Sequence, residues 1–350
     1  MKASLTTCDA ILLTSYYSRL YYSSFSSSAG YVLITKENTY LIVDFRYYEM
    51  AKNNKQKKYI LLKNKNTIDE TLINIINDLK INTLGFEENH LTVTNYEKLK
   101  TLFKTKKINL KLIKASKTIA KDRAIKTDEE ITLIKKAQAI TDKAFNYILG
   151  EIKPGITEKQ IEYLLNQFIT SNGAKTSFET IAISGKNTSL PHGKSSNKKL
   201  KSGEFLLIDY GACYNNYCSD MTRTVALGKP DDEMKKIYEI VLEANKRAIN
   251  NIHKDQRASE TDKTARDYIS EKGYGKYFGH SLGHGVGLEC HEQPTISQKN
   301  NDKILNKNIF TIEPGIYIPR KFGVRIEDIV YIDGENVINI TNSEKKLIEI

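Results

Sequence analysis

The first 120 residues alternate between short apolar runs and a longer stretch whose apolar residues have helical spacing. That stretch, Thr67–Leu79, is predicted to be a helix. The short runs, separated by polar turns, predict strands over Tyr31–Thr35, Tyr40–Asp44, Thr83–Phe86 and Ile108–Ile113. This mixture indicates a small α/β domain over residues 1–120, and the polar segment 114–127 is predicted to be a connection.

Two helix starts mark the next part of the chain. Thr127 and Glu130 have the spacing of a capping box, and apolar residues at helical spacing follow as far as Gly150. Thr157 and Gln160 repeat this signal for a second helix that runs to about residue 172. Further helices are predicted over residues 231–253 and 259–272, and strands over residues 205–212, 220–227, 283–290, 308–317 and 323–332. Residues 121–350 are therefore predicted to form a second, larger domain.

The composition excludes several classes of protein. The 350 residues are 40% hydrophobic and 27% charged, as in ordinary globular proteins. No apolar run approaches the roughly 20 residues of a membrane helix, and the first residues lack the apolar stretch of a secretory signal. The net charge of +11 is concentrated in residues 1–120, which hold 19 Lys and Arg against 10 Asp and Glu. No nucleic-acid-binding motif accompanies this excess, so we interpret it as a solvated lysine-rich face and expect neither a nucleic-acid nor a membrane partner.

The four cysteines are too few, in a chain of this length, to form a disulfide framework. Their number and spacing predict a reducing, cytoplasmic environment. Cys213 and Cys218 are close enough in sequence to suggest half of a zinc site. No second Cys or His pair stands at matching spacing, so zinc is disfavoured there.

Three of the six histidines, His280, His284 and His291, fall within twelve residues. Three glycines stand among them, and glycines allow a ligand to approach the backbone closely. The spacing of these glycines does not match a dinucleotide-binding motif. The histidine cluster is therefore a candidate site of another kind.

Four carboxylates accompany this cluster in the predicted strands. Asp209 and Asp220 belong to one predicted hairpin, and alone they fit a salt bridge or a turn. Glu313 and Glu327 repeat the arrangement in the last two predicted strands. Four buried carboxylates repel one another unless cations neutralise them. With His284 they form an oxygen-rich set that suits two divalent metal ions, with Mn²⁺ as first choice and Co²⁺ or Zn²⁺ as alternatives.

These residues and their surroundings resemble the pita-bread metallopeptidases and, within them, the Xaa-Pro peptidases aminopeptidase P and prolidase. The motifs that carry the resemblance are Leu190-Pro-His192-Gly, Asp209-x10-Asp220-Met-Thr-Arg-Thr, His280-Ser-Leu-Gly-His284-Gly-Val-Gly-Leu-Glu-x-His291-Glu, Ile312-Glu313-Pro-Gly-Ile-Tyr317 and Val324-Arg-Ile-Glu327-Asp. Residues 31–51 look like the creatinase-type N-terminal domain, although Asp44-Phe45-Arg46 replaces the usual Asp-Gly-Arg. The resemblance implies an α/β creatinase-like domain over residues 1–120, followed by an α+β pita-bread catalytic domain over residues 121–350.

The resemblance also implies roles for the candidate residues. The metal ligands would be Asp209, Asp220, His284, Glu313 and Glu327, of which Asp220 and Glu327 would bridge both ions. A metal-bridging hydroxide would attack the peptide bond before proline, and Glu313 would relay its proton. The catalytic residues would be His192, His280, His291 and Glu313, and the substrate-binding residues would be His192, His280, Tyr317 and Arg325. For Tyr317 and Arg325, simple packing and pairing is the alternative.

The implied activity is hydrolysis of the bond between an N-terminal residue and proline. We favour an Xaa-Pro aminopeptidase over an Xaa-Pro dipeptidase (prolidase), with short proline-containing peptides as substrates and a homodimer as the assembly. Methionine aminopeptidases share the five ligands, but they usually lack the N-terminal domain and a histidine at the place of His280. Relatives that serve only as binding modules have typically lost metal ligands, and creatinase-type enzymes work without these metals, so both are disfavoured.

Overall fold

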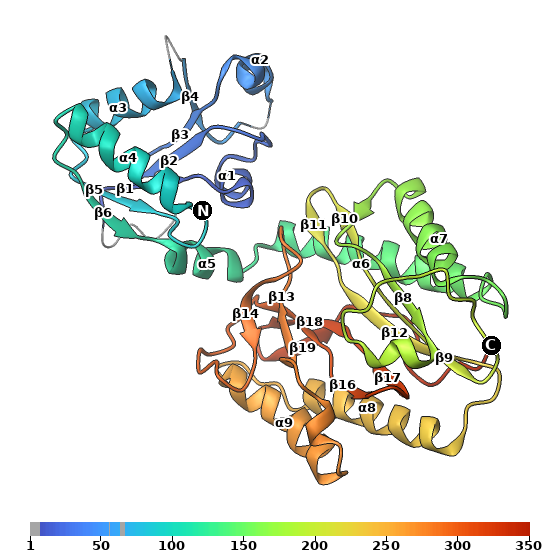
Figure 1. Cartoon of the computed structure of the whole chain (residues 1–350). Helices are drawn as coiled ribbons and strands as arrows, with labels where there is room; N and C mark the ends of the chain where they lie inside the picture. Colours follow the sequence, from blue (N-terminus) through green and yellow to red (C-terminus); the bar gives the residue numbers. More distant parts are fainter. Residues whose placement is uncertain (1–7, 56, 64–66) are drawn as a thin grey trace. The chain divides into compact units, whose positions relative to one another are not determined.

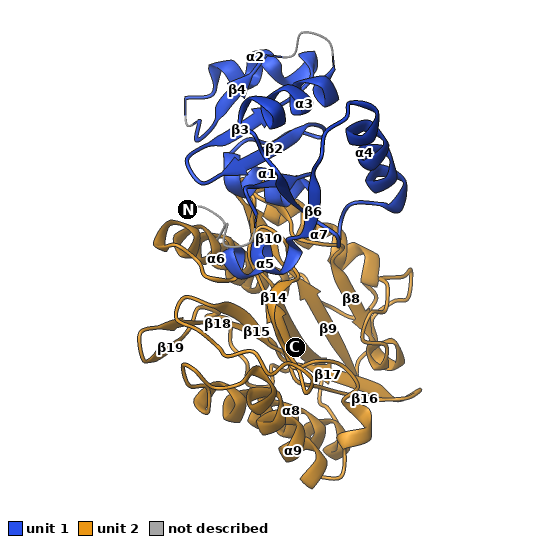
Figure 2. Cartoon of the chain, turned by 90° about the vertical axis from the view of Figure 1, so that its left-hand side faces the viewer, with its two compact units in different colours: residues 1–123 blue, residues 124–350 orange. Residues whose placement is uncertain are grey.

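A computed structural model describes residues 8–55, 57–63 and 67–350, and the chain divides into two compact units, Met1–Arg123 and Ala124–Ile350 (Figure 1; Figure 2). Each unit has its own sheets and its own buried core. Within the described ranges, no helix is long and apolar enough to cross a membrane.

The first unit is built on a six-stranded mixed sheet in the order β4-β3-β2-β1-β5-β6. Strand β1 pairs antiparallel with β2 and parallel with β5, which places it inside the sheet. The strands are β1 (Ala10–Leu13), β2 (Tyr31–Thr35), β3 (Thr39–Ile42), β4 (Ile60–Leu62), β5 (Thr83–Phe86) and β6 (Lys111–Lys114). The predictions for β2 and β5 are confirmed residue for residue, whereas β3 and β6 are displaced by a few residues from their predicted positions.

Helices cover both faces of this sheet, because successive strand residues point to opposite faces. Ile11 and Leu13 pack with α1, α2 and α5, whereas Ala10 and Leu12 pack with α3 and α4. These helices are α1 (Tyr16–Ser23), α2 (Phe45–Asn53), α3 (Ile68–Asp78), α4 (Val93–Thr105) and α5 (Ser116–Ala124). The predicted helix over 67–79 is confirmed as α3, and Thr67 caps its first turn.

Helix α5 shows that the prediction of an irregular connection over residues 114–127 is wrong. Ile119 is 3% exposed and lies in the core with Ala115, while Lys117 and Lys121 are exposed. Most residues of this segment are polar, so its sequence shows little helical periodicity apart from Ile119. Tertiary burial of that residue therefore stabilises a helix that the apolar pattern did not predict.

Two pairs of helices flank the strands of the second unit (Figure 1). Helices α6 (Asp128–Leu149) and α7 (Glu158–Ser171) pack on one group of strands, and α8 (Asp232–Asn250) and α9 (Ala258–Glu271) pack on another. Both predicted capping boxes are confirmed: Thr127 and Thr157 accept hydrogen bonds from the backbones of Glu130 and Gln160, whose side chains accept in return from the threonine N–H groups.

The strands of the second unit form smaller sheets, which include β12-β9-β8, β11-β10-β7 and β14-β13-β15-β18-β19, and the pair β16-β17. The strands are β7 (Lys175–Thr176), β8 (Ile181–Ser184), β9 (Glu204–Tyr210), β10 (Ala212–Tyr214), β11 (Tyr217–Cys218), β12 (Met221–Leu227), β13 (Gly283–Gly285), β14 (Glu292–Ile296), β15 (Ile309–Ile312), β16 (Gly315–Ile318), β17 (Phe322–Arg325), β18 (Asp328–Asp333) and β19 (Asn336–Asn339). The predicted pairing of 205–212 with 220–227 is confirmed as the antiparallel pair β9 and β12.

The last three predicted strands are wrong in one respect, because each is interrupted. The segment 283–290 is a strand only as far as β13, 308–317 is divided into β15 and β16, and 323–332 into β17 and β18. Strand β15 pairs with β18, while β16 pairs with β17. Both chain segments therefore leave one sheet and enter another, and they do so between the same two strand pairs.

Glu313 and Glu327 lie at these two breaks. Pro314 lacks the N–H that a continuous ladder would require, which favours the first break. The backbone N–H of Glu313 donates to the carbonyl of Leu282, and that of Glu327 donates to the carbonyl of Thr222. These bonds tie one glutamate to the residue before β13 and the other to β12 itself, so four distant parts of the chain meet there.

Candidate metal centre and active site

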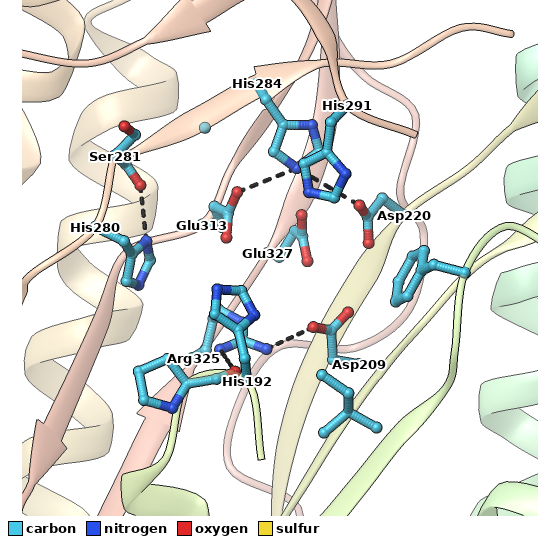
Figure 3. Close-up of a pocket in the computed structure, with 14 residues that line it drawn as sticks. His192, Asp209, Asp220, His280, Ser281, His284, His291, Glu313, Arg325 and Glu327 are labelled. Carbon is cyan, nitrogen blue, oxygen red and sulfur yellow. Dashed lines mark hydrogen bonds and ion pairs between the residues drawn. The ribbon is translucent and has the colours of Figure 1, made fainter. Parts of the chain in front are cut away.

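A cavity of about 310 Å³ opens at these breaks (Figure 3). Nine of the ten predicted site residues line it, namely His192, Asp209, Asp220, His280, His284, His291, Glu313, Arg325 and Glu327. Tyr317, the tenth, is not a lining residue, but its hydroxyl hydrogen-bonds to His280, which is one. The remaining lining residues are Phe178, Ile181, Pro191, Ser281 and Gly283.

The two aspartates reach the cavity from neighbouring strands but are not paired across them. Asp209 lies in β9 and Asp220 directly precedes β12. The ladder places Asp209 opposite Thr222, and the hairpin β10–β11 separates the two acids along the chain. The side chains of Asp209 and Asp220 therefore line one cavity without being cross-strand neighbours.

His284 lies between two acids (Figure 3). Its Nε2 is 3.6 Å from Asp220 Oδ2 and 3.4 Å from Glu313 Oε1. Its Nδ1 is 3.1 Å from the carbonyl oxygen of Gly285, and because a carbonyl only accepts, Nδ1 carries the proton. The lone pair of the neutral ring is then at Nε2 and faces two carboxylates. Asp220, His284 and Glu327 each bring one possible ligand atom to within 4.8 Å of the others.

Burial and mutual repulsion disfavour the ionised forms of the acids. Burial, followed by the charge of Asp209, raises the pKa of Asp220 well above its usual value. Burial and then Asp220 do the same to the pKa of Glu327, and burial raises the pKa of Glu313 to about 8. Among the lining residues, Arg325 is the one arginine or lysine, and a single guanidinium cannot neutralise four carboxylates.

Two buried carboxylate oxygens without hydrogen-bond partners in the described structure indicate that this site requires a cation. Oδ1 of Asp209 and Oδ1 of Asp220 have no hydrogen-bond partner within the described parts of the chain. A buried acceptor without a partner is costly, and a cation would satisfy both. Carboxylate oxygens with one imidazole are a ligand set for divalent ions such as Mn²⁺, Co²⁺ or Zn²⁺. The residues present therefore fit divalent metal ions.

Arg325 connects Asp209 to other residues around the cavity by hydrogen bonds. Its side chain is 3% exposed and donates to Asp209 Oδ2 at 2.6 Å, to the Tyr317 hydroxyl at 2.8 Å and to Thr222 Oγ1 at 3.0 Å. It also donates to the carbonyl of Pro191 at 3.2 Å. Planar guanidinium groups hold several acceptors in one geometry, so Arg325 fixes these groups relative to one another.

The hydrogen bonds of His280 occupy both of its ring nitrogens. Nδ1 lies 2.8 Å from the carbonyl of Ser281 and must donate to it, and Nε2 accepts from the Tyr317 hydroxyl at 3.0 Å. Burial, and next the charge of Arg325, lowers the pKa of His280 to about 4. The ring is therefore neutral near pH 7 and held in one orientation.

His192 and His291 are the more accessible histidines of the cavity. Both are exposed in the structure, and the ring of His291 lies 4.1 Å from that of His284 between centroids. Burial, and next His284, lowers the pKa of His291. Figure 3 places His291 beside His284 and His192 beside Arg325. Both side chains can therefore reach a molecule in the cavity.

Three hydrogen bonds to the acids lie outside the sequence prediction. Each joins an acid to a short donor, namely Thr222 to Glu327 at 2.7 Å, Thr311 to Glu313 at 3.2 Å and Cys290 to Asp220 at 3.0 Å. Thr311 stands two residues before Glu313, a spacing that places two extended residues on one face. Strand periodicity could have indicated Thr311, whereas no local pattern indicates Cys290 or Thr222.

Known proteins match both units. Residues 132–334 match metallopeptidase family M24, and residues 2–125 match the creatinase/prolidase N-terminal domain. The chain belongs to metallopeptidase family M24. The resemblance to the pita-bread metallopeptidases and the predicted pair of domain folds are thereby confirmed.

Several relatives match over nearly their whole length. The Xaa-Pro dipeptidase of Pyrococcus furiosus is 41% identical over 333 residues, which are 94% of this chain and 92% of that protein. The solved Xaa-Pro dipeptidase from Bacillus anthracis is 42% identical, with 98% and 95% of the chains covered and a TM-score of 0.93. The X-Pro aminopeptidase from Thermotoga maritima is 36% identical, with 99% of both chains covered and a TM-score of 0.91.

Proposed function

We propose that this chain is an Xaa-Pro dipeptidase that works with two divalent metal ions, Mn²⁺ first among them. The observation that carries the proposal is the convergence of four acids and His284 on one cavity. The sequence favoured an aminopeptidase. The relatives named Xaa-Pro dipeptidase, at 41% and 42% identity, support the dipeptidase alternative better.

The ions would be held by Asp220, His284 and Glu327, with Asp209 and Glu313 completing the set. When bound, such ions activate water and polarise a peptide carbonyl. The charges of the acids repel one another in the metal-free site, and bound cations would relieve this repulsion.

The other cavity residues would bind and orient the peptide. Proline has no N–H and presents a rigid ring, which suits an apolar wall of Phe178, Ile181 and Pro191. His192 and His291 would donate hydrogen bonds to the carbonyl oxygen as negative charge develops on it. Since both nitrogens of His280 are occupied, that ring would form a fixed wall of the pocket.

Glu313 would carry the proton. It lines the cavity among the acids, and its Oε1 accepts a hydrogen bond from Thr311. A carboxyl group in this position can accept a proton during attack on the carbonyl and hand it to the leaving nitrogen of proline. The dipeptide is thereby divided into an amino acid and free proline.

A panel of three peptides tests the proposed substrate. The protein with Mn²⁺ should hydrolyse Xaa-Pro dipeptides, and it should cleave matched Xaa-Pro-Yaa tripeptides and Xaa-Ala dipeptides at least about tenfold more slowly in kcat/KM. The tripeptide comparison reports whether the site requires the free carboxylate of proline. Cleavage of Xaa-Ala at the same rate would contradict any proline-specific function.

An Xaa-Pro aminopeptidase is the second candidate. The 36% identity to the X-Pro aminopeptidase from Thermotoga maritima over 99% of both chains favours it. If the protein cleaves Xaa-Pro-Yaa tripeptides as fast as Xaa-Pro dipeptides, or faster, the aminopeptidase is the correct assignment.

His291→Ala and His192→Ala should each lower kcat by about 10²–10³-fold, the usual effect of removing one positioned donor. Neither residue is among the five proposed ligands, so the metal content should stay at the parental level. Atomic spectroscopy and steady-state kinetics measure the two quantities separately. Loss of metal in either variant would make that histidine a ligand and contradict its assignment.

A further inference from the structure

Two cysteines occupy a tight hairpin next to the metal centre. Strands β10 and β11 are joined by Asn215 and Asn216, whose φ angles of 48° and 71° are those of a two-residue turn with left-handed backbone. Cys213 and Cys218 stand directly opposite each other across this hairpin. The structure shows both as thiols. Neither has a part in the proposed peptidase chemistry.

The hydrogen bonds of the hairpin indicate the distance between the Cα atoms of these two cysteines. Ser219 N–H donates to the carbonyl of Ala212 at 2.8 Å, so the pair next to the cysteines is a hydrogen-bonded one. Cys218 N–H instead donates to Gly287, away from β10. The cysteines are therefore a non-hydrogen-bonded pair, for which Cα atoms lie about 4.5 Å apart and side chains are closest. Disulfides form at Cα separations of about 4.4–6.8 Å.

The surroundings favour reaction at Cys213. This residue is partly exposed, whereas Cys218 is 4% exposed. On the other side of Cys213, β7 places Lys175 directly opposite it. A hydrogen bond with the Cys218 thiol lowers the pKa of Cys213; burial opposes this shift, and the charge of Lys175 adds to it. Accessible thiols near cations are the ones that oxidants attack.

We propose that Cys213 and Cys218 are a redox-active dithiol that a peroxide converts to a disulfide, and that this oxidation lowers the activity of the adjacent site. The effect on activity rests on the proposed peptidase function; the disulfide itself does not. In a reducing compartment such a bond would be transient.

The reaction balances with hydrogen peroxide as the oxidant. The Cys213 thiolate attacks one peroxide oxygen, the O–O bond breaks, and a sulfenic acid and hydroxide form. The Cys218 sulfur then attacks the sulfenic sulfur, the S–S bond forms and the S–O bond breaks. The thiol protons leave with the two departing oxygens, so two thiols and one peroxide give one disulfide and two waters.

The new bond would act on the metal centre by two routes. Along the chain, Cys218 is two residues from Asp220. Across the fold, Cys218 Sγ lies 3.7 Å from the carbonyl of Leu288, in the loop that continues to Cys290 and His291. Cys290 in turn donates to Asp220. Moving Cys218 Sγ to bonding distance of Cys213 therefore disturbs both Asp220 and the loop that supports it.

The test is peroxide treatment of the full chain, followed by alkylation, trypsin and mass spectrometry. Both cysteines fall in the single tryptic peptide 202–223, while Cys8 and Cys290 fall in other peptides. We expect this peptide to lose two hydrogens and to escape alkylation until dithiothreitol is added. Dipeptidase kcat/KM should fall by about tenfold in parallel and recover with dithiothreitol, since sub-ångström to 1 Å shifts at a reacting centre have effects up to about 10²-fold.

Variants separate this disulfide from other oxidation. Cys213→Ser should keep its activity in peroxide, and Cys8→Ser, the same change in the first unit, should respond like the parent. Peptide 202–223 that remains alkylated after peroxide, or an oxidised cysteine found only elsewhere, would overturn the dithiol. A mapped disulfide with unchanged activity would overturn its regulatory effect. A chain without any peptidase activity would contradict the proposed function, and the peptide masses would still decide the dithiol.

Discussion

Replacing Asp220 with asparagine should deprive the protein of its metal ions and of nearly all peptidase activity. The Asp220 carboxylate lies 3.6 Å from His284 Nε2, in the group that also contains Glu327. An amide of the same shape carries no charge and is a far weaker ligand. Bound divalent ions lower such barriers by several kcal/mol, and a loss of about 5–6 kcal/mol corresponds to about 10⁴-fold in kcat/KM. Atomic spectroscopy and assays on an Xaa-Pro dipeptide measure both effects.

Thermal stability distinguishes this loss from misfolding. In chelator, the Tm of Asp220→Asn should equal or exceed that of the parent, because one of the mutually repelling acids has gone. Added Mn²⁺ should raise the Tm of the parent but not that of the variant. Asp333→Asn, the same change at an exposed position of the second unit, should behave like the parent. Parental metal content and activity in Asp220→Asn would contradict the metal assignment.

Replacing Arg325 with methionine should destabilise the metal-free protein by about 3–5 kcal/mol. The guanidinium is buried and donates to Asp209 Oδ2 at 2.6 Å, and the other oxygen of Asp209 has no hydrogen-bond partner among the described residues. Removing the arginine therefore leaves a buried carboxylate without compensation. Urea unfolding in the presence of chelator measures the loss without a metal ion that could replace the arginine.

Two further variants identify the cause. The double variant Arg325→Met, Asp209→Asn should recover much of the lost stability, since it removes both charges. Arg247→Met is the matched control: Arg247 lies 2.7 Å from Glu243, but these side chains are 49% and 40% exposed. Such a surface pair contributes at most about 1 kcal/mol. A loss for Arg325→Met no greater than the control would contradict a structural role for the buried pair.

The elements that the sequence predicted well are those specified by neighbouring residues. Thr127 and Thr157 start α6 and α7 as predicted, because a capping box involves residues only three apart. The β9–β12 pair follows from two apolar runs joined by a short connection that contains Asn215 and Asn216. Helix α5 was missed for the opposite reason, since the burial of Ile119 against the sheet stabilises it and its own composition does not indicate it.

The sequence by itself determined the inventory of the site: four acids and a histidine cluster in predicted strands, whose charges require cations. Tertiary structure alone decided how these groups are arranged. The breaks at Glu313 and Glu327 arise because each segment changes its partner strand, and Arg325 meets Asp209 from 116 residues away. Cys290 donates to Asp220 across 70 residues, and Thr222 to Glu327 across 105. Local patterns cannot encode such contacts, because they depend on how whole sheets pack and not on the spacing of residues along one element.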